Sequence, residues 1–349
     1  MANNANTLRF LTNQALAAGS QTPTDLLLPV FGGEVIAAFE EANQFLPLVN
    51  YKQITEGKDV KYPAVWKIGS EYHEAGSELL GMDVDTKEYT ISLDDRPLVA
   101  HFEVDDVDVS MAHFDIRSEL ANECGREMAR QMDRKVACLL INAARVTADS
   151  GTNSFPIGGN QYSTADGFAD FSAATGNTER DGAALVEAIA AIAQAMDEKD
   201  VPVADRCCVV RVGLYYALRR LGLPYWDGSA VQNAAAGGIW GRNDLGIAGP
   251  NANAAQGYQV PIDVFGTPVY CSNHIPTANI TTGPAKYQGN FTKSMGVMFH
   301  KSAIGVVQMA GITTETMRDV RRQSDFMVAK MLMGGGALRP YAAYEISAS

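Results

Sequence analysis

The sequence predicts an α+β fold, and three stretches of the chain carry that prediction. Residues 51–104 alternate apolar and polar side chains as strands do, with glycine-rich turn material between them. Residues 115–145 have the apolar periodicity of one long helix. Short apolar segments typical of buried strands follow from residue 204 onward. Strands on both sides of a long helix favour the α+β class.

The start of the chain predicts a loose arm followed by a short helix. Residues 1–25 are polar and rich in Asn, Gln, Thr and Ala, which is typical of a weakly attached terminal segment. The helix is expected around Glu34–Asn43, where Val35, Ile36 and Phe39 form an apolar face.

Residues 51–104 predict one long two-stranded hairpin. Its arms are YKQITEGKDVKYPAVWKIG and TKEYTISLDDRPLVAHFEV, and the polar, acidic stretch SEYHEAGSELLGMDVD joins them. Few of these residues can form a core of their own, and an isolated hairpin is marginally stable in water. The hairpin therefore needs a covering surface outside itself, which is a first indication of assembly.

The helix Asp115–Arg145 is expected to be a packed backbone helix. Asp115 suits an N-cap, and the i,i+3 pairs Glu123–Arg126 and Glu127–Arg130 belong on its solvent side. Apolar residues recur at every fourth position and form one slowly drifting row: Ile116, Leu120, Cys124, Met128, Met132, Val136 and Leu140.

The second half of the chain predicts one more long helix, a short helix and several strands. The long helix is TERDGAALVEAIAAIAQAMDEKD, and the segments DRCCVVRV and GLYYALRRLG predict a buried strand and a short helix. Gly228–Gly257 is small, Asn-rich and long, so it is expected to be a loop. Further strands are expected at IDVFGTPVYCS, MGVMFH and IGVVQM, and a last one at YAAYEI.

Three consecutive glycines, Gly334–Gly336, precede that last predicted strand. No Lys, Ser or Thr follows them to touch a phosphate, so a phosphate-binding loop is not expected. The interpretation is a strand–turn–strand arrangement, in which glycine permits a tight turn or the close approach of another chain.

Composition and charge limit the function classes. The 349 residues carry a formal net charge of −12, which is the opposite of the basic excess that sequence-independent DNA binding requires. No apolar stretch is long enough to span a bilayer, and the start shows no secretory signal. The five cysteines form no zinc or redox motif. A protein made in a cytoplasm, without a membrane segment, is expected.

The sequence offers little support for catalysis. It contains no nucleophile elbow and no HExxH motif, and no cofactor is expected. The sharpest acidic cluster comprises Glu103, Asp105, Asp106 and Asp108. Such a cluster holds a divalent metal, forms a solvated strand end, or makes ion pairs within or between subunits. Its natural complement is the basic run of Arg318, Arg321 and Arg322, which alternatively contacts nucleic acid.

Three long stretches together resemble the major capsid protein of tailed phages, closest to the short-tailed, T7-like (podovirus or autographivirus) group. They are VFGGEVIAAFEEANQF, the segment from DDRPLVAHFEVDDVDVS through the long helix, and the segment from VMFHKSAIGVVQM to YAAYEI. FGTPVYCSNHIP is a further stretch typical of such proteins. Their order and spacing also match, so the resemblance covers most of the chain.

The resemblance implies the Hong Kong 97-type capsid fold, with five parts along the chain. They are an N-terminal arm (1–50), an extended hairpin loop (51–104) that lies over a neighbouring subunit, a peripheral domain (105–203) with spine helix 115–145, an axial domain (204–311), and a C-terminal return to the peripheral domain (312–349). The three glycines would then lie at a turn in the peripheral domain.

The resemblance also implies a function, which is self-assembly into pentamers and hexamers of an icosahedral virion shell. The implied partners are other copies of the chain, a separate scaffolding protein, a portal protein and possibly a decoration protein, with double-stranded DNA enclosed but not recognised by sequence. No isopeptide crosslink is predicted. The alternatives are a nonviral nanocompartment shell of the same fold and, remotely, an α/β enzyme using residues 103–108. The predicted intersubunit contacts are Glu103, Asp105, Asp106, Asp108, Arg318, Arg321, Arg322 and Arg339.

Overall fold

The computed structural model describes residues 23–65, 70, 72–73, 86–111, 116–146, 158–163, 178–220 and 262–348. Its helices are α2 (Pro23–Ala42), α3 (Asp106–Met111), α4 (Ile116–Ala144), α5 (Thr178–Glu198) and α6 (Val212–Arg220). The predicted long helix is confirmed to within a residue at each end, as α4. The helix expected at Glu34–Asn43 is part of the longer α2. Residues 1–22, the N-cap candidate Asp115 and the predicted loop Gly228–Gly257 lie outside the described residues.

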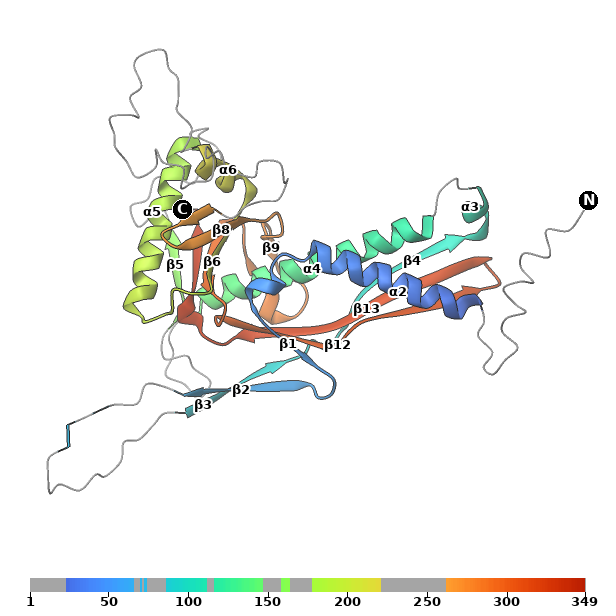
Figure 1. Ribbon diagram of the computed structural model, residues 1–349, viewed down its shortest axis with the longest axis horizontal. Helices are drawn as coiled ribbons and strands as arrows, with labels where there is room; N and C mark the ends of the chain where they lie inside the picture. The colour runs from blue at the N-terminus through green and yellow to red at the C-terminus, as the bar shows by residue number, and fades with distance from the viewer. Residues whose placement is uncertain are drawn as a thin grey trace, which may run out of the picture.

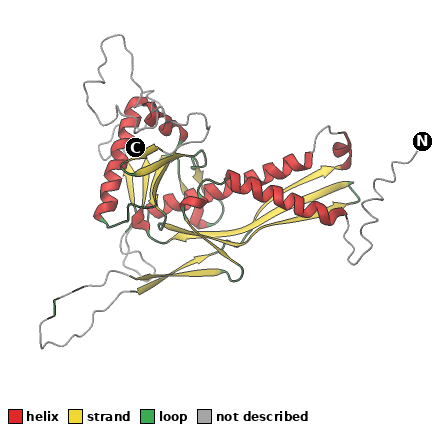
Figure 2. Ribbon diagram, in the orientation of Figure 1, coloured by secondary structure: helices red, strands yellow, loops and turns green. Residues whose placement is uncertain are grey.

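Four strands form a long, narrow sheet, called the long sheet below. Its order is β1-β12-β13-β4, with β1 (Asn50–Ile54) parallel to β12 (Ile304–Asp319) and the other neighbours antiparallel, β13 (Ser324–Ala337) lying between β12 and β4 (Leu98–Asp105). Helices α2 and α4 run along one face of this sheet (Figure 1). Figure 2 shows the strands and the two helices extending together away from the rest of the molecule as a tongue, at whose end α3 lies.

The predicted hairpin exists, but it is shorter than expected. Only β2 (Asp59–Val65) and β3 (Thr86–Ser92) pair with each other. The outer parts of the predicted arms became β1 and β4, which pair with β12 and β13 in the long sheet, so the prediction of one hairpin over 51–104 was wrong in this respect. The physical reason is that β12 and β13 are long strands whose edges accept β1 and β4, and the pairing partly buries Tyr51 of β1 and Leu98, Ala100 and Phe102 of β4 against the main core.

A second sheet of six strands has the order β5-β14-β11-β6-β8-β7. Its strands are β5 (Asn160–Ser163), β14 (Ala343–Ser347), β11 (Ser294–His300), β6 (Arg206–Val210), β8 (Thr267–Cys271) and β7 (Ile262–Val264). The short strands β9 (Asn279–Ile280) and β10 (Gly289–Asn290) form a separate two-stranded ladder. Helices α5 and α6 lie at this end of the molecule (Figure 1). All five residues of β6 are buried, as expected for DRCCVVRV.

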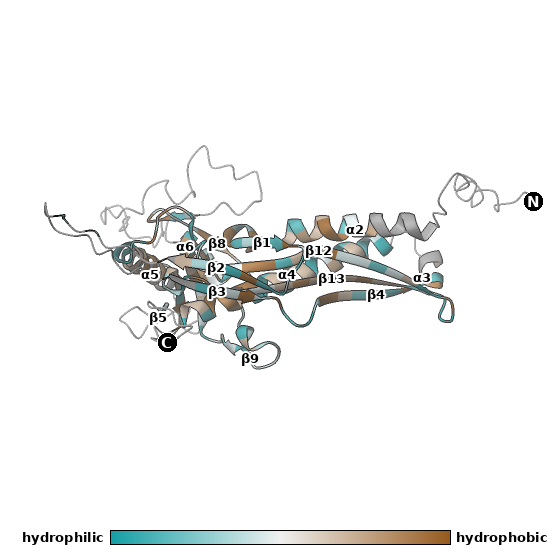
Figure 3. Ribbon diagram, turned by 90° about the horizontal axis from the view of Figure 1, so that it is seen from below, coloured by the Kyte–Doolittle hydropathy of each residue, from teal (hydrophilic) through white to brown (hydrophobic). Residues whose placement is uncertain are grey.

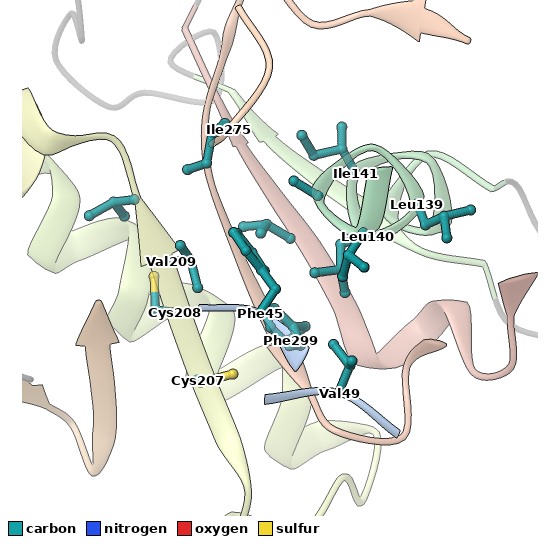
Figure 4. Close-up of a cluster of buried hydrophobic side chains, with 14 of the residues drawn as sticks. Phe45, Val49, Leu139, Leu140, Ile141, Cys207, Cys208, Val209, Ile275 and Phe299 are labelled. Carbon is teal, nitrogen blue, oxygen red and sulfur yellow. The ribbon is translucent and has the colours of Figure 1, made fainter. Parts of the chain in front are cut away.

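The main core lies where α4 reaches the six-stranded sheet. Figure 4 shows Leu140 and Ile141 of α4 facing Phe299 of β11 and Val209 of β6, with Phe45 between them. The predicted row on α4 is confirmed for its central members, because Cys124, Met128, Met132, Val136 and Leu140 are all buried. Helix α4 therefore packs against both sheets and joins the two ends of the molecule.

Helix α2 crosses α4 at close range, and Gly125 of α4 permits this crossing. A Cβ added at Gly125 would lie 2.5 Å from the carbonyl oxygen of Val35 and 2.9 Å from the Cβ of Ala38. Figure 3 views the molecule edge on and shows the two helices stacked along the thin tongue, with apolar stretches along β12 and β13.

One predicted boundary falls within a strand of the structure. A boundary between residues 311 and 312 would divide β12, which runs from Ile304 to Asp319 with an irregularity in its pairing between Met309 and Thr313. The last strand, β14, pairs with β11 in the six-stranded sheet rather than with the long sheet. The division of the chain into arm, hairpin, peripheral and axial parts stays a prediction in its finer limits.

The acidic run Glu103–Asp108 is divided between a strand and a helix. Strand β4 ends at Asp105, and Asp106 begins the short helix α3. The backbone N–H of Asp106 donates to the carbonyl oxygen of Gln323 in the turn after β12, which closes the ladder at this point. Asp106 and Asp108 therefore both lie in helix α3, and neither belongs to strand β4.

Candidate functional site

The acidic and basic runs meet at the end of the tongue. β13 lies between β4 and β12, so that Asp325 is opposite Val104 on one side and opposite Arg318 on the other. We call this group the tip network; it comprises Glu103, Asp106, Arg117, Arg318, Arg322, Ser324 and Asp325. The two runs were expected to be complementary in charge, and the structure brings them together although Asp106 and Arg318 are 212 positions apart in the sequence.

Arg318 is the centre of the tip network. Its guanidinium forms a two-pronged ion pair with Asp106, one prong measuring 2.5 Å, and a third contact of 3.0 Å with Asp325. The hydrogen bonds from Arg318 lower the pKa of the Asp106 carboxyl below its ordinary 3.8. In turn, the carboxylates of Asp106 and Asp325 raise the pKa of the Arg318 guanidinium. Arg117 of α4 binds the other oxygen of Asp325 at 2.5 Å, which ties the helix layer to the sheet.

A second contact group surrounds Glu103. The hydroxyl of Ser324 donates to Glu103 at 2.5 Å, and Arg322 lies 3.5 Å from the same carboxylate. Four of the eight predicted contact residues are thus brought together within one chain: Glu103, Asp106, Arg318 and Arg322. Their contact with a neighbouring subunit stays a prediction.

The other four predicted residues lie apart from these pairs. Asp105 and Arg321 are exposed near the same end of the tongue, and Asp108 lies in α3. Arg339 is exposed at the far end of β13, next to Pro340, and is not part of the tip network. Within the described ranges no three His, Cys, Asp or Glu side chains are placed to hold a metal ion. Among the described helices, none is long and apolar enough to cross a membrane.

The three glycines Gly334–Gly336 lie inside β13, so the prediction of a turn was wrong. They pair with Val307, Val306 and Gly305 of β12. A Cβ at Gly334 would collide with the backbone of Ser92 and Leu93, at the base of the hairpin, and one at Gly335 would lie 2.5 Å from Leu139 of α4 on the opposite face. The glycines mark the place where the hairpin and α4 press on the sheet from its two sides.

A family comparison decides what this architecture is. A family model described as Gp10A-like major capsid protein matches residues 62–347 of the 349. The chain belongs to this family of major capsid proteins.

Relatives and solved structures agree with the family assignment. The major capsid protein of Escherichia phage T7 is 27% identical over 341 residues, which cover 95% of this chain and 94% of the relative. A chain from the capsid of the cyanophage P-SCSP1u is 29% identical, with a TM-score of 0.66 and 88% of each chain covered. A chain of the mature capsid of bacteriophage PhiM1, at 16% identity, shares the fold with a TM-score of 0.65 over 88% of this chain and 87% of that one.

The expected Hong Kong 97-type fold and the shell-forming role in the virion are therefore confirmed. The relatives named above are phage head proteins, which favours the phage capsid over the nonviral nanocompartment. In a shell protein the functional sites are the surfaces and joints that fix how the subunit presents its protruding parts.

The sequence did not predict one such joint of the capsid subunit, which is a cluster of charged and polar side chains around Asp94. Asp94, between β3 and β4, has a side chain only 2% exposed; its carboxylate lies 2.5 Å from Lys286 Nζ and 3.7 Å from Lys135 Nζ, and accepts a hydrogen bond of 3.0 Å from the Tyr287 hydroxyl. Burial and the negative charge of Asp94 raise the pKa of Tyr287. The cluster lines a groove of about 1150 Å³ at the base of the hairpin and ties the hairpin to α4 and to residues 283–288.

Two further buried carboxylates join distant segments. Asp133 of α4 accepts hydrogen bonds from the backbone N–H groups of Gln44 and Phe45, at 3.0 and 3.2 Å, and lies 2.8 Å from Nδ1 of His274. Glu345 of β14 is fully buried and is bound by Arg145, at the end of α4, through contacts of 2.6 and 2.7 Å. Nothing in the local sequence distinguishes these carboxylates from exposed ones.

Proposed function

We propose that the chain assembles into pentamers and hexamers, which close into an icosahedral shell around packaged double-stranded DNA, and that it has no enzymatic activity. The observation that carries this proposal is the presence of two protruding elements, the tongue and the hairpin, which leave the molecule in different directions (Figure 1). Cyclic oligomers require two different patches that meet on neighbouring copies. The tongue and the hairpin supply such unlike patches.

The implied partners follow from the same role. We propose a separate scaffolding protein and a portal protein as partners, with a decoration protein as a further candidate. The formal net charge of −12 supports enclosure of DNA without tight binding, since a wall that repels phosphate lets DNA move freely during packaging. Tight DNA binding by assembled shells at physiological salt would contradict this part.

The tip residues are proposed to contact neighbouring subunits as well as one another. Arg321 and Asp105 are exposed beside the tip network, and several members of the network itself keep a third or more of their side chains exposed. Charge reversal at Arg321 should therefore lower shell yield and its tolerance of salt, while the melting temperature of the isolated subunit stays unchanged. Charge reversal at Lys301, which is exposed at the other end of the molecule, is the matched control.

Negative-stain electron microscopy of the expressed chain, alone and with a co-expressed scaffold candidate, tests the proposal as a whole. Closed shells of uniform diameter are the expected result. If a demonstrably folded chain gave only small particles under every condition, the proposal would fail.

A further inference from the structure

The groove at the base of the hairpin carries a local excess of positive charge. We call it the basal groove; it is lined by residues 58–59, 92–99, 135 and 283–286, where β2 and β3 join the body of the molecule (Figure 1). Four cationic side chains line it, those of Lys58, Arg96, Lys135 and Lys286, against three carboxylates. The chain as a whole has the opposite balance, with a formal net charge of −12. The basal groove is therefore complementary to the acidic excess of another copy.

Two of the four cations are matched by the carboxylates of the groove itself. Lys286 Nζ lies 2.5 Å from Oδ1 of the buried Asp94. Lys58 Nζ lies 3.0 Å from the carboxylate of Asp95, and both of these side chains are mostly exposed. The third carboxylate, that of Asp59, adjoins Lys58 in the sequence and acts on the same ammonium group. These carboxylates leave the other two cations of the groove without a matching charge.

Lys135 of α4 is the first unmatched cation. Its Nζ lies 3.7 Å from Oδ2 of Asp94, which is too long for a hydrogen bond, and Lys286 and the hydroxyl of Tyr287 already occupy that carboxylate. Lys135 makes no hydrogen bond to any other described residue, although its side chain is only 25% exposed. An ammonium group has three donors, and leaving them unsatisfied away from water costs free energy. A carboxylate that enters the groove would satisfy them.

Arg96, between β3 and β4, is the second unmatched cation. Its side chain is exposed, and it forms neither an ion pair nor a hydrogen bond with another described residue. Guanidinium groups bind carboxylates through two parallel hydrogen bonds. Leu93, Pro97 and Pro284 add apolar surface to the same lining, which suits a peptide segment. A nucleic-acid backbone fits less well, because its continuous negative charge would meet the three carboxylates.

We infer that the basal groove binds a carboxylate side chain of a neighbouring copy of this chain, which pairs with Lys135 and Arg96. The inference rests on the proposed function, because assembly presents a second copy at a fixed place, and it adds a contact surface apart from the tip network. Groove and carboxylate belong to different patches, so the contact is heterologous, as the contacts within a ring of copies are.

Zero-length cross-linking tests this contact directly. Shells are assembled with the scaffold candidate from equal amounts of nitrogen-14 and nitrogen-15 labelled chains. They are then treated with a water-soluble carbodiimide, which joins a carboxylate and a neighbouring amine as an amide. Mass spectrometry should find the Lys135 peptide joined to an Asp or Glu peptide of the other isotope, which also identifies the carboxylate.

The exposed pair Lys58–Asp95 is the internal control, because its two side chains meet within one chain and should link peptides of the same isotope. If this control link formed while Lys135 was linked only within its own chain, or not at all, the inference would be overturned and the shell-forming function would stand.

An assembly assay gives an independent readout. Arg96→Glu should lower shell yield at least tenfold with unchanged melting temperature of the subunit, whereas Arg96→Lys, which keeps the charge, should retain most of the yield. Lys301→Glu makes the same charge reversal at an exposed lysine outside the groove and should leave the yield unchanged. A normal yield from Arg96→Glu would overturn the inference. Failure of the wild-type chain to form shells under any condition would refute the proposed function, and this inference with it.

Discussion

Oδ1 of Asp94 lies 2.5 Å from Nζ of Lys286, in a carboxylate that is almost completely buried. The hydroxyl of Tyr287 and the ammonium of Lys135 share the same carboxylate. Because Asp94 directly follows the hairpin, and the other residues belong to α4 and to the segment 283–288, this contact fixes how the hairpin leaves the body of the capsid subunit.

Replacing Asp94 with Ala should therefore destabilise the subunit and loosen the hairpin. The change leaves two half-buried ammonium groups and a buried hydroxyl without their partner, which costs about 3 kcal/mol of unfolding free energy. Urea unfolding followed by circular dichroism measures this loss. The matched control is Asp95→Ala, since Asp95 is 84% exposed and forms its ion pair with the exposed Lys58. Equal effects at the two positions would contradict the structural role given to Asp94.

The same substitution by Ala is expected to have a large effect at Gly334 and a small effect at Gly336. Gly334→Ala places a methyl group into the backbone of Ser92 and Leu93, so the hairpin base must shift, at a cost of about 1–3 kcal/mol. At Gly336 the nearest atom, Cγ1 of Ile91, lies at an ordinary 3.4 Å from the added Cβ. Gly336→Ala should therefore change the unfolding free energy by less than about 1 kcal/mol. The melting temperatures of the two variants test this prediction. Equal melting temperatures would show that the hairpin does not press on β13 at Gly334.

Replacing Glu345, at the junction of α4 with the six-stranded sheet, should also lower the unfolding free energy strongly. Besides Arg145, its carboxylate accepts hydrogen bonds from Gln161 at 2.6 Å and Ser294 at 2.5 Å. In Glu345→Gln, an amide N–H₂ replaces one carboxylate oxygen and faces the donors Arg145, Gln161 and Ser294. The substitution also removes the negative charge that faces Arg145. We therefore expect a loss of about 3–5 kcal/mol of unfolding free energy.

In a double-mutant cycle with Arg145→Met, the double variant should be less destabilised than the sum of the two single variants, and this coupling energy should account for most of the loss. Glu315→Gln serves as the control, because Glu315 is 62% exposed and its pair with Lys330 contributes about 1 kcal/mol or less. Additive effects of the Glu345 and Arg145 substitutions would show that the two side chains do not act together.

The sequence predicted those elements whose signal is local. The apolar row along α4 and the continuous apolar run of β6 identify these elements without knowledge of their neighbours, and both are confirmed. The three glycines were misinterpreted because a turn and a close backbone approach require the same residue. Only the position of Ser92 on one side and Leu139 on the other distinguishes the two cases.

The parts that failed depend on contacts between distant segments. Whether Asn50–Ile54 and Leu98–Asp105 pair with each other or with β12 and β13 is set by competition between strands, which local alternation does not reveal. Likewise, the opposite charges of the two runs predicted ion pairs within or between subunits, and only the structure shows that Arg318 and Asp106 pair within a single chain.

Arg318 makes Asp106 the basis of a pH prediction. A lowered pKa means that the ion pair stabilises the folded tip above the ordinary carboxyl value of 3.8, and that this contribution is lost as the pH falls through the lower folded value. The tip network should therefore stay intact at pH 4 and open only under stronger acid. Carbon-13 NMR of the Asp106 carboxyl measures its titration midpoint in the folded subunit. Arg318→Met removes the hydrogen bonds that lower the pKa most, so the midpoint should move upward toward 3.8. Arg321→Met changes an exposed neighbour outside the network and should leave the midpoint in place. If Arg318→Met left the titration midpoint of Asp106 unchanged, the ion pair between Asp106 and Arg318 would not stabilise the end of the tongue.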